Sequence, residues 1–210
     1  MSKKPAAKYS SVDSSKYHHG DLRQSLLQAA TAMIGTSGIA ALSMRKLADQ
    51  VGVSRMAPYH HFKDKNALLC AIAEQGFERK NQSLDSIAEQ SNDLLPRQQF
   101  EQYVDYYIRF AAQNSEHYDL MFSRDIWKNN QASESLKVIA HDNFQRWVGW
   151  IDKLQQQGLF DQKHSALRTA QVTWGTLHGL CRLLNDGVYT NLENLEQISQ
   201  TAVDMLLKDG

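Results

Sequence analysis

Hydrophobic residues recur every three or four positions from Leu22 almost to the end of the chain, which is the spacing of one buried helix face. No stretch shows the alternation of apolar and polar residues between turn residues that is typical of strands. The pattern therefore predicts an all-α protein. Besides two short helices between residues 43 and 61, helices are expected near residues 20–35, 65–90, 97–114, 115–123, 132–157, 164–187 and 192–208.

The stretch Leu42–Phe62 carries the most specific pattern in the chain. Ser43 can cap a helix that has a single apolar stripe. The residues of this stripe are Met44, Leu47, Ala48 and Val51. Gly52 can adopt the left-handed conformation that ends such a helix, and Ser54 is expected to cap a second one. Two short helices joined by a short turn with glycine are the helix-turn-helix pattern, whose second helix can enter the major groove of DNA.

The second helix, expected over residues 55–61, has two different faces. At about 100° per residue, one arc of about 140° presents a guanidinium, a flexible apolar group, a phenol and an imidazole, which suit base edges and phosphates. These four residues are Arg55, Met56, Tyr59 and His60, and the opposite side holds Ala57, Pro58 and His61. Pro58 would stand at the fourth helical position, where its ring strains the first turn. We therefore expect a helix that is distorted or reset at its start.

The block GVSRMAPYHHFKDKNALL, preceded by SMRKLADQ and by a helix over Asp21–Ile34, resembles the N-terminal DNA-binding domain of the TetR family of transcriptional regulators. The resemblance covers about residues 18–69. In addition, APY at 57–59 and WGTLHG at 174–179 resemble the subgroup named for a Trp-His-Gly signature. The resemblance implies an all-helical homodimer whose larger C-terminal domain binds a small ligand and modulates DNA affinity.

Charge is distributed unevenly, although the 23 Lys and Arg balance the 23 Asp and Glu over the whole chain. Residues 1–65 hold ten basic and four acidic residues, a net charge of +6, and residues 66–210 hold thirteen and nineteen, a net charge of −6. A basic module on an acidic body is typical of a DNA-binding domain attached to a domain with another role. We expect a flexible basic arm over 1–16, a three-helix helix-turn-helix DNA-binding domain over 17–65, and a larger helical-bundle domain for ligand binding and dimerisation over 66–210.

Residues around the motif complete the expected DNA-binding surface. Lys63 and Lys65 flank Asp64, the expected cap of the next helix, and a helix N-terminus with two lysines can hold a phosphate. The alternative is that both lysines are only solvated charges. The full candidate set is Ser43, Arg45, Ser54, Arg55, Met56, Tyr59, His60, Lys63 and Lys65.

The second half of the chain is rich in aromatic residues, and all four tryptophans lie beyond residue 120. These side chains could line a ligand pocket or simply pack the core. Trp174 and His178 are neighbours on one helix face, so the histidine could orient a ligand or close a packing network. Arg182 could neutralise an acidic ligand or form a surface salt bridge. The candidate ligand-binding residues are Phe122, Trp127, Phe144, Trp147, Trp174 and His178.

The last two helices carry more apolar residues than one small body obviously needs. By the family resemblance, they would pair with their copies in a homodimer as a four-helix bundle. Two-fold symmetry would also double the readout of a short recognition helix on a palindrome. The alternative is that these apolar residues only complete the core of one subunit.

Motifs of catalysis and metal binding are missing from the sequence. Gly52 and Ser54 begin like a nucleophile elbow, but Met56 replaces the second glycine. HExxH, Walker and paired CxxC motifs do not occur. We therefore expect no enzymatic activity, no cofactor and no metal.

Cys70 and Cys181 fit reduced thiols in apolar helices. Without an apolar leader or a run of about 18 apolar residues, a cytoplasmic protein with no membrane contact is expected.

The sequence thus predicts a transcriptional regulator, most simply a repressor that binds a palindromic operator as a dimer and responds to a small-molecule effector of unknown identity. The alternative is a DNA-binding architectural factor, or one controlled by a partner protein, without a small ligand. A C-terminal body packed solid with aromatic side chains would favour that alternative. An activator is a third possibility, because a DNA-binding domain does not encode the direction of regulation.

Overall fold

The computed structural model describes residues 19–90, 93–128, 130–189 and 195–207, and this part of the chain consists of helices, turns and loops without a strand. The predicted all-α fold is confirmed. The arm predicted over residues 1–16 lies outside the described residues. The helices are α1 (His19–Ala41), α2 (Met44–Val51), the 3-10 helix η1 (Ala57–His60), α3 (Lys65–Gln90), α4 (Pro96–Gln113), α5 (Ser115–Met121), α6 (Arg124–Lys128), α7 (Glu134–Gln156), α8 (Ala166–Asn185) and α9 (Leu195–Leu206).

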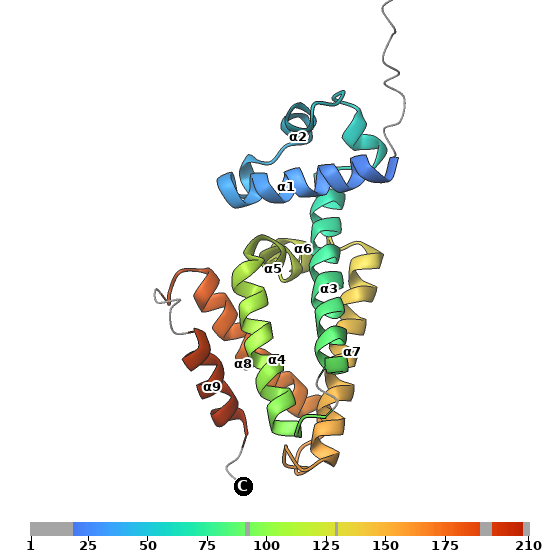
Figure 1. Ribbon diagram of the computed structural model, residues 1–210. Coiled ribbons are helices and arrows are strands. Elements are labelled where there is room, and N and C mark those ends of the chain that lie inside the picture. Colours follow the sequence, from blue (N-terminus) through green and yellow to red (C-terminus); the bar gives the residue numbers. More distant parts are fainter. Residues whose placement is uncertain (1–18, 91–92, 129, 190–194, 208–210) are drawn as a thin grey trace, which may run out of the picture.

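The helices α1, α2 and η1 form a small unit at one end of the molecule (Figure 1). Helix α1 extends beyond the predicted end at residue 35, but Gly38 has φ 74° and ψ 166°, so the regular helix is interrupted there. The core of this unit lies between α1 and α2, where Leu26, Leu27 and Leu47 are fully buried. The amphipathic spacing of the sequence therefore packs these two helices face to face.

Both predicted ends of α2 are confirmed. The Ser43 hydroxyl accepts a hydrogen bond from the backbone N–H of Lys46 at 3.2 Å, which satisfies one of the free donors of the first turn. Gly52 has φ 76°, and its N–H donates to the carbonyls of Ala48 and Asp49. An L-residue rarely adopts this left-handed conformation, so glycine here fixes the turn that aims the following segment.

Helix α3 runs without interruption from the small unit into the larger body (Figure 1). Its start is fixed by Asp64, whose carboxylate accepts a hydrogen bond from the N–H of Ala67 at 2.8 Å. Within the body, α3 packs against α5 and α7, and α4 packs against α8 and α9. The small unit is therefore attached to the body through the continuous helix α3 and through contacts between α1 and α5.

The body encloses an aromatic core. Phe100, Tyr107 and Tyr118 are fully buried between the helices. Phe100 also stacks near Trp147 and meets Phe160 edge-on, with ring centroids 6.4 and 5.2 Å away. Many of the aromatic residues of the second half therefore pack the core, and some of them also line the cavity described below.

Most helix boundaries lie within two residues of the prediction. The largest difference is α6, where no helix was predicted. This five-residue helix follows Phe122, and the indole N–H of Trp127 donates to the carbonyl of Met121 at 2.8 Å. A helix this short depends on such tertiary contacts, so periodicity in the sequence could not reveal it.

Candidate DNA-binding surface and ligand cavity

The segment after the turn differs from the predicted α-helix over residues 55–61. It is the 3-10 helix η1, and Pro58 occupies its first turn. Backbone N–H groups at this position make no hydrogen bond within the helix, so a proline without an N–H is tolerated there. The predicted reset at Pro58 is confirmed. The capping role predicted for Ser54 is wrong, because the helix begins at Ala57, Met56 holds the cap position, and no side chain caps it.

The predicted faces of this segment survive the change of helix type. The four residues Arg55, Met56, Tyr59 and His60 are exposed. Among them, Met56 is 61% exposed and Tyr59 46%. Pro58 is buried on the opposite side. This set is called the recognition surface below.

The recognition surface rests on a buried support. The backbone N–H of Phe62 donates to the carbonyl of Pro58 at 2.9 Å, and the Phe62 ring is only 3% exposed. The guanidinium of Arg23 from α1 lies 5.4 Å from the centre of that ring, within the range of a cation–π contact. The short segment is therefore held by α1 in addition to its own backbone hydrogen bonds.

The remaining candidates for DNA contact fall into two groups. Arg45, Ser54 and Lys63 are exposed and extend the basic surface beside η1. Lys65, in contrast, donates from its ammonium to the carbonyl of Ile39 at 2.6 Å. This bond ties the start of α3 to the end of α1. Lys63 is therefore the freer of the two lysines, and Ser43 is engaged as a helix cap.

A cavity of about 600 Å³ opens in the body, within the usual range for small-molecule sites. All six predicted ligand-binding residues line it: Phe122, Trp127, Phe144, Trp147, Trp174 and His178. Sequence reasoning missed Phe77 and Lys80 of α3 and Gln171 of α8, which also line the cavity. The body is thus not packed solid, which removes the observation that would have favoured a regulator without a ligand.

A chain of hydrogen bonds runs along one wall of the cavity. The indole N–H of Trp174 donates to the Tyr107 hydroxyl at 3.0 Å, the hydroxyls of Tyr107 and Tyr118 lie 3.2 Å apart, and the Tyr118 hydroxyl lies 2.7 Å from His178 Nδ1. Burial lowers the pKa of His178 to about 4, so its ring is neutral at pH 7. His178 thus closes a packing network and also lines the cavity.

Lys80 is the unexpected charged residue of this site. Its side chain is 2% exposed, its ammonium donates to Asn143 Oδ1 at 2.9 Å, and it lies 4.8 Å from the centre of the Tyr107 ring. Burial lowers the pKa of Lys80 to about 7. Arg182, the cation singled out in the sequence, instead forms ion pairs with Asp119 and Asp186 at 2.7 and 2.8 Å, which confirms the salt-bridge alternative.

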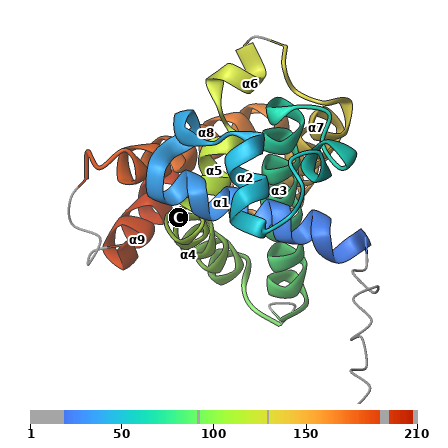
Figure 2. The same ribbon diagram turned by 90° about the horizontal axis from the view of Figure 1, so that it is seen from above.

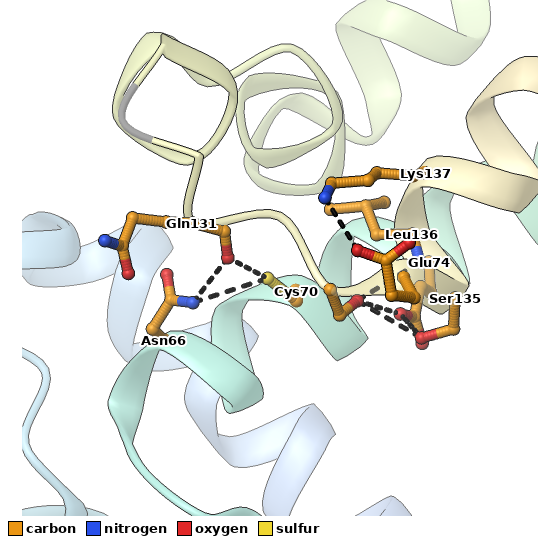
Figure 3. Close-up of polar contacts among 9 residues, drawn as sticks. Asn66, Cys70, Glu74, Gln131, Ser135, Leu136 and Lys137 are labelled. Carbon is orange, nitrogen blue, oxygen red and sulfur yellow. Dashed lines mark hydrogen bonds and ion pairs between the residues drawn. The ribbon is translucent and has the colours of Figure 1, made fainter.

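The cavity is connected to the DNA-binding unit along α3. Phe77 and Lys80 line the cavity, whereas Asn66 and Glu74 lie closer to η1 and contact the segment that leads from α6 into α7 (Figure 3). Asn66 donates to the carbonyl of Gln131 at 2.7 Å, and Glu74 accepts a hydrogen bond from Ser135 at 2.5 Å. The segment between Trp127 and the cavity residues of α7 is therefore bonded directly to the upper part of α3.

Helix α5 makes a second connection. A methyl group added to Gly76 of α3 would lie 2.5 Å from Sδ of Met121, so the backbone of α3 packs directly against side chains of α5. A methyl group added to Gly35 of α1 would lie 2.7 Å from the Glu116 carboxylate of α5. The same helix carries Tyr118 of the hydrogen-bond chain. Helix α5 thus lies at the end of the body that faces α1 (Figure 1), and the two helices overlap in the view from above (Figure 2).

The last two helices leave an apolar groove on the outside of the body. Its volume is about 830 Å³, and its walls come from α8 and α9. Met205 is 83% exposed and Val188 61%. Leu177 and Leu184, by contrast, are buried in the subunit core. The apolar residues of these helices therefore divide between the core of one subunit and an outer face.

The described ranges contain neither a membrane-spanning helix nor a cluster of metal ligands. No helix among these residues is long and apolar enough to cross a membrane. No group of three or more His, Cys, Asp or Glu side chains in the same part of the chain is arranged to hold a metal ion.

A helix-turn-helix unit joined by one long helix to a helical body with a cavity defines a DNA-binding regulator with a separate ligand-binding domain. The comparisons with known proteins agree. Residues 26–72 match the family described as bacterial regulatory proteins, tetR family, and residues 100–206 match the tetracyclin repressor-like C-terminal domain. The chain therefore belongs to the TetR family. The Trp-His-Gly subgroup stays a prediction.

Individual relatives agree with this assignment. The chain is 40% identical over 52 residues to the class C tetracycline repressor protein of Escherichia coli, a match that covers 25% of the chain and 24% of that protein. It is 28% identical over 116 residues to the HTH-type transcriptional activator FasR of Mycolicibacterium smegmatis, covering 55% and 52%. These curated relatives are thus matched over about a quarter to a half of their length.

Among solved structures, the fold is similar to that of a protein of unknown function from Rhodococcus sp. RHA1. The TM-score is 0.78 and the sequence identity 30%, and the match covers 91% of this chain and 96% of that one. The similarity thus extends over both the DNA-binding unit and the body.

Proposed function

We propose that this protein is a transcriptional repressor that binds a palindromic operator as a homodimer and leaves it when a small molecule occupies the cavity. The recognition surface carries this proposal. It combines an exposed arginine, a phenol and an imidazole on a rigidly supported segment, next to the exposed Arg45 and Lys63. Arginine suits guanine in the major groove, and lysine suits phosphates.

Release by a ligand requires that the ligand bind one conformation more tightly than the other. Helix α3 offers the route, because it begins next to η1 and carries Phe77 and Lys80 at the cavity. A ligand that fills the cavity would displace α3 or the segment bonded to Glu74, and the two recognition surfaces of a dimer would then no longer fit successive major grooves.

The groove between α8 and α9 supports dimerisation. Exposed apolar faces of this kind are typical of interaction sites, and a second copy of the same two helices would complete a four-helix bundle. Its two-fold symmetry matches the symmetry of a palindrome.

The test measures DNA binding by the purified protein at increasing salt concentrations, with fluorescence anisotropy as the readout. A palindromic duplex from the DNA flanking its own gene is compared with a random duplex. We expect two subunits per specific duplex, a preference of at least 10³-fold for the palindrome and a steep loss of affinity with salt. Equal affinity for both duplexes would instead support the architectural alternative.

Two single variants separate base contact from phosphate contact. Arg55→Ala should cost about 1–3 kcal/mol on the palindrome and little on random DNA. Lys63→Ala should weaken binding to both duplexes alike and reduce the salt slope by about 1. Lys63 serves here in place of Lys65, because Lys65 holds α3 to the end of α1. Equal losses on both duplexes for Arg55→Ala would contradict its assigned role.

A second candidate function is activation, because one matched relative is named an activator. A reporter gene placed behind the bound palindrome decides between the two directions. Expression should rise when the gene for this protein is deleted if it represses, and fall if it activates.

A further inference from the structure

The ligand cavity contains a charge that is not neutralised within the described part of the chain. Lys80 is only 2% exposed to solvent, and no carboxylate of the described residues lies within ion-pair distance of its ammonium. Its contacts are the neutral oxygen of Asn143 and the face of the Tyr107 ring. A buried ammonium without a counter-ion is unfavourable, so a negatively charged group that enters the cavity would be stabilised beside it.

The other nearby cation cannot serve this purpose. Both ends of the Arg182 guanidinium are paired, with Asp119 and with Asp186. Lys80 itself is a lining residue of the cavity. The site therefore offers one unpaired positive charge to an incoming molecule.

A second donor follows from the direction of the hydrogen-bond chain. The Trp174 indole N–H can only donate, so Tyr107 accepts it and uses its own proton toward Tyr118. Tyr118 then donates to His178 Nδ1, and the proton of the neutral ring resides on Nε2. We assign this tautomer because it gives each proton of this chain an acceptor, whereas the full reverse direction would leave the Tyr107 proton without one. His178 thereby adds a neutral N–H donor to a residue that lines the cavity.

The rest of the wall is aromatic. Trp174 and His178 stack 5.2 Å apart, and Phe122 and Phe144 meet Trp174 at 5.7 and 6.0 Å. Such walls favour flat rings, which can stack or meet them edge-on. We propose that the effector is a carboxylate with a flat, ring-containing apolar body, and that Lys80 pairs with its carboxylate. This proposal rests on the proposed function, since it assumes that the cavity is the effector site.

The test uses three probes that share a naphthalene ring system and differ in charge. They are the anion 1-naphthylacetate, its neutral amide 1-naphthylacetamide, and the cation 1-naphthylmethylamine. Their dissociation constants are measured by isothermal titration calorimetry on the full-length protein at pH 6.5. We expect the anion to bind at least tenfold more tightly than the amide, and the cation most weakly. This comparison within the unmodified protein requires no variant.

Lys80→Met, which keeps an unbranched apolar side chain and removes the charge, should abolish the preference for the anion. Lys153→Met, an exposed lysine of α7 in the same domain, should leave the preference unchanged and controls for net charge. Equal affinity for anion and amide, an anion preference that persists in Lys80→Met, or no binding of any probe would each overturn the proposal. The same preparation is assayed for operator binding. If operator binding is intact, only the effector class is wrong, whereas its absence contradicts the proposed function.

Discussion

At the scale of single residues, Lys80 is a buried cation without a carboxylate partner among the described residues. The groups that face it are Tyr107 from α4, Asn143 from α7, and His178 and Cys181 from α8. Burial lowers the pKa of Lys80 to about 7 and raises the pKa of Cys181 to about 12. In the unfolded chain Lys80 has an ordinary pKa near 10.5.

This difference predicts a pH-dependent stability. Between about pH 7 and pH 10.5 the unfolded state binds more protons at Lys80 than the folded state, so this residue makes folding more favourable as the pH rises. We expect the free energy of unfolding to increase by about 1 kcal/mol per pH unit from pH 7 to 8.5. Above that range the buried thiol and tyrosines oppose the trend, because their raised pKa values act in the other direction.

The measurement is urea denaturation at pH 7.0, 7.5, 8.0 and 8.5, and the Lys80→Met variant is the control. Subtracting the slope of this variant isolates Lys80 from the other titrating groups. A wild-type slope equal to that of Lys80→Met would show that Lys80 is not buried as a potentially charged group.

The positions of single residues could be predicted from the sequence where local structure determines them, but not where tertiary packing does. The outward positions of Arg55 and Tyr59 were predictable, because local periodicity and the turn at Gly52 determine them. The role of Ser54 was not, because Pro58 shifts the helix start by tertiary packing. Lys80 was missed for a similar reason. Its burial depends on α7 and α8 closing over α3, and a lysine in a helix of mixed sequence looks like a surface residue.

At the scale of helices, α3 and α5 pack closely at Gly76. The backbone of Gly76 faces Met121 and His117, and the contact distances of 2.5 and 3.2 Å for an added methyl group leave no room for a side chain. The spacing of these two helices is therefore set by a residue without a side chain.

Gly76→Ala should destabilise the protein by about 1–3 kcal/mol, because Met121 is fully buried and its displacement disturbs the packed core. Thermal unfolding followed by circular dichroism measures the effect. The matched control is Gly149→Ala on α7, where an added methyl group meets nothing within 4 Å, and alanine should stabilise the helix by about 0.5–1 kcal/mol. A Gly76→Ala variant as stable as Gly149→Ala would show that α3 and α5 are not in close contact.

The helices themselves were largely predictable, because Asp64, Ser133 and Ser165 cap them with local hydrogen bonds. The six residues that the sequence predicted for a ligand site all line the cavity, whereas the aromatic Phe77 was missed. Whether they enclosed space or filled it could not be predicted, since cavity volume depends on the distances between helices that are far apart in sequence.

At the scale of the whole molecule, the outer face of α8 and α9 determines the proposed assembly. Met205→Asp places a charge in the apolar groove and should weaken dimerisation by at least tenfold. Sedimentation velocity over a range of protein concentrations measures the change, and operator affinity should fall with it. Val138→Asp is the control, because Val138 is 59% exposed on α7 and does not line the groove. A dimer that is unchanged by Met205→Asp would place the interface elsewhere.

The unbroken path of α3 has a mechanical consequence. The stretch from Lys80 to Lys65 spans about 22 Å at about 1.5 Å per residue, and it is held near one end by cavity residues. A tilt of about 5° around that end would shift the start of the helix by roughly 2 Å, which exceeds the tolerance of a hydrogen bond. In a symmetric dimer the two shifts add. Helix α3 can thus act as a lever arm. A movement of a fraction of an ångström around a bound molecule would become a misalignment of both recognition surfaces on the DNA double helix.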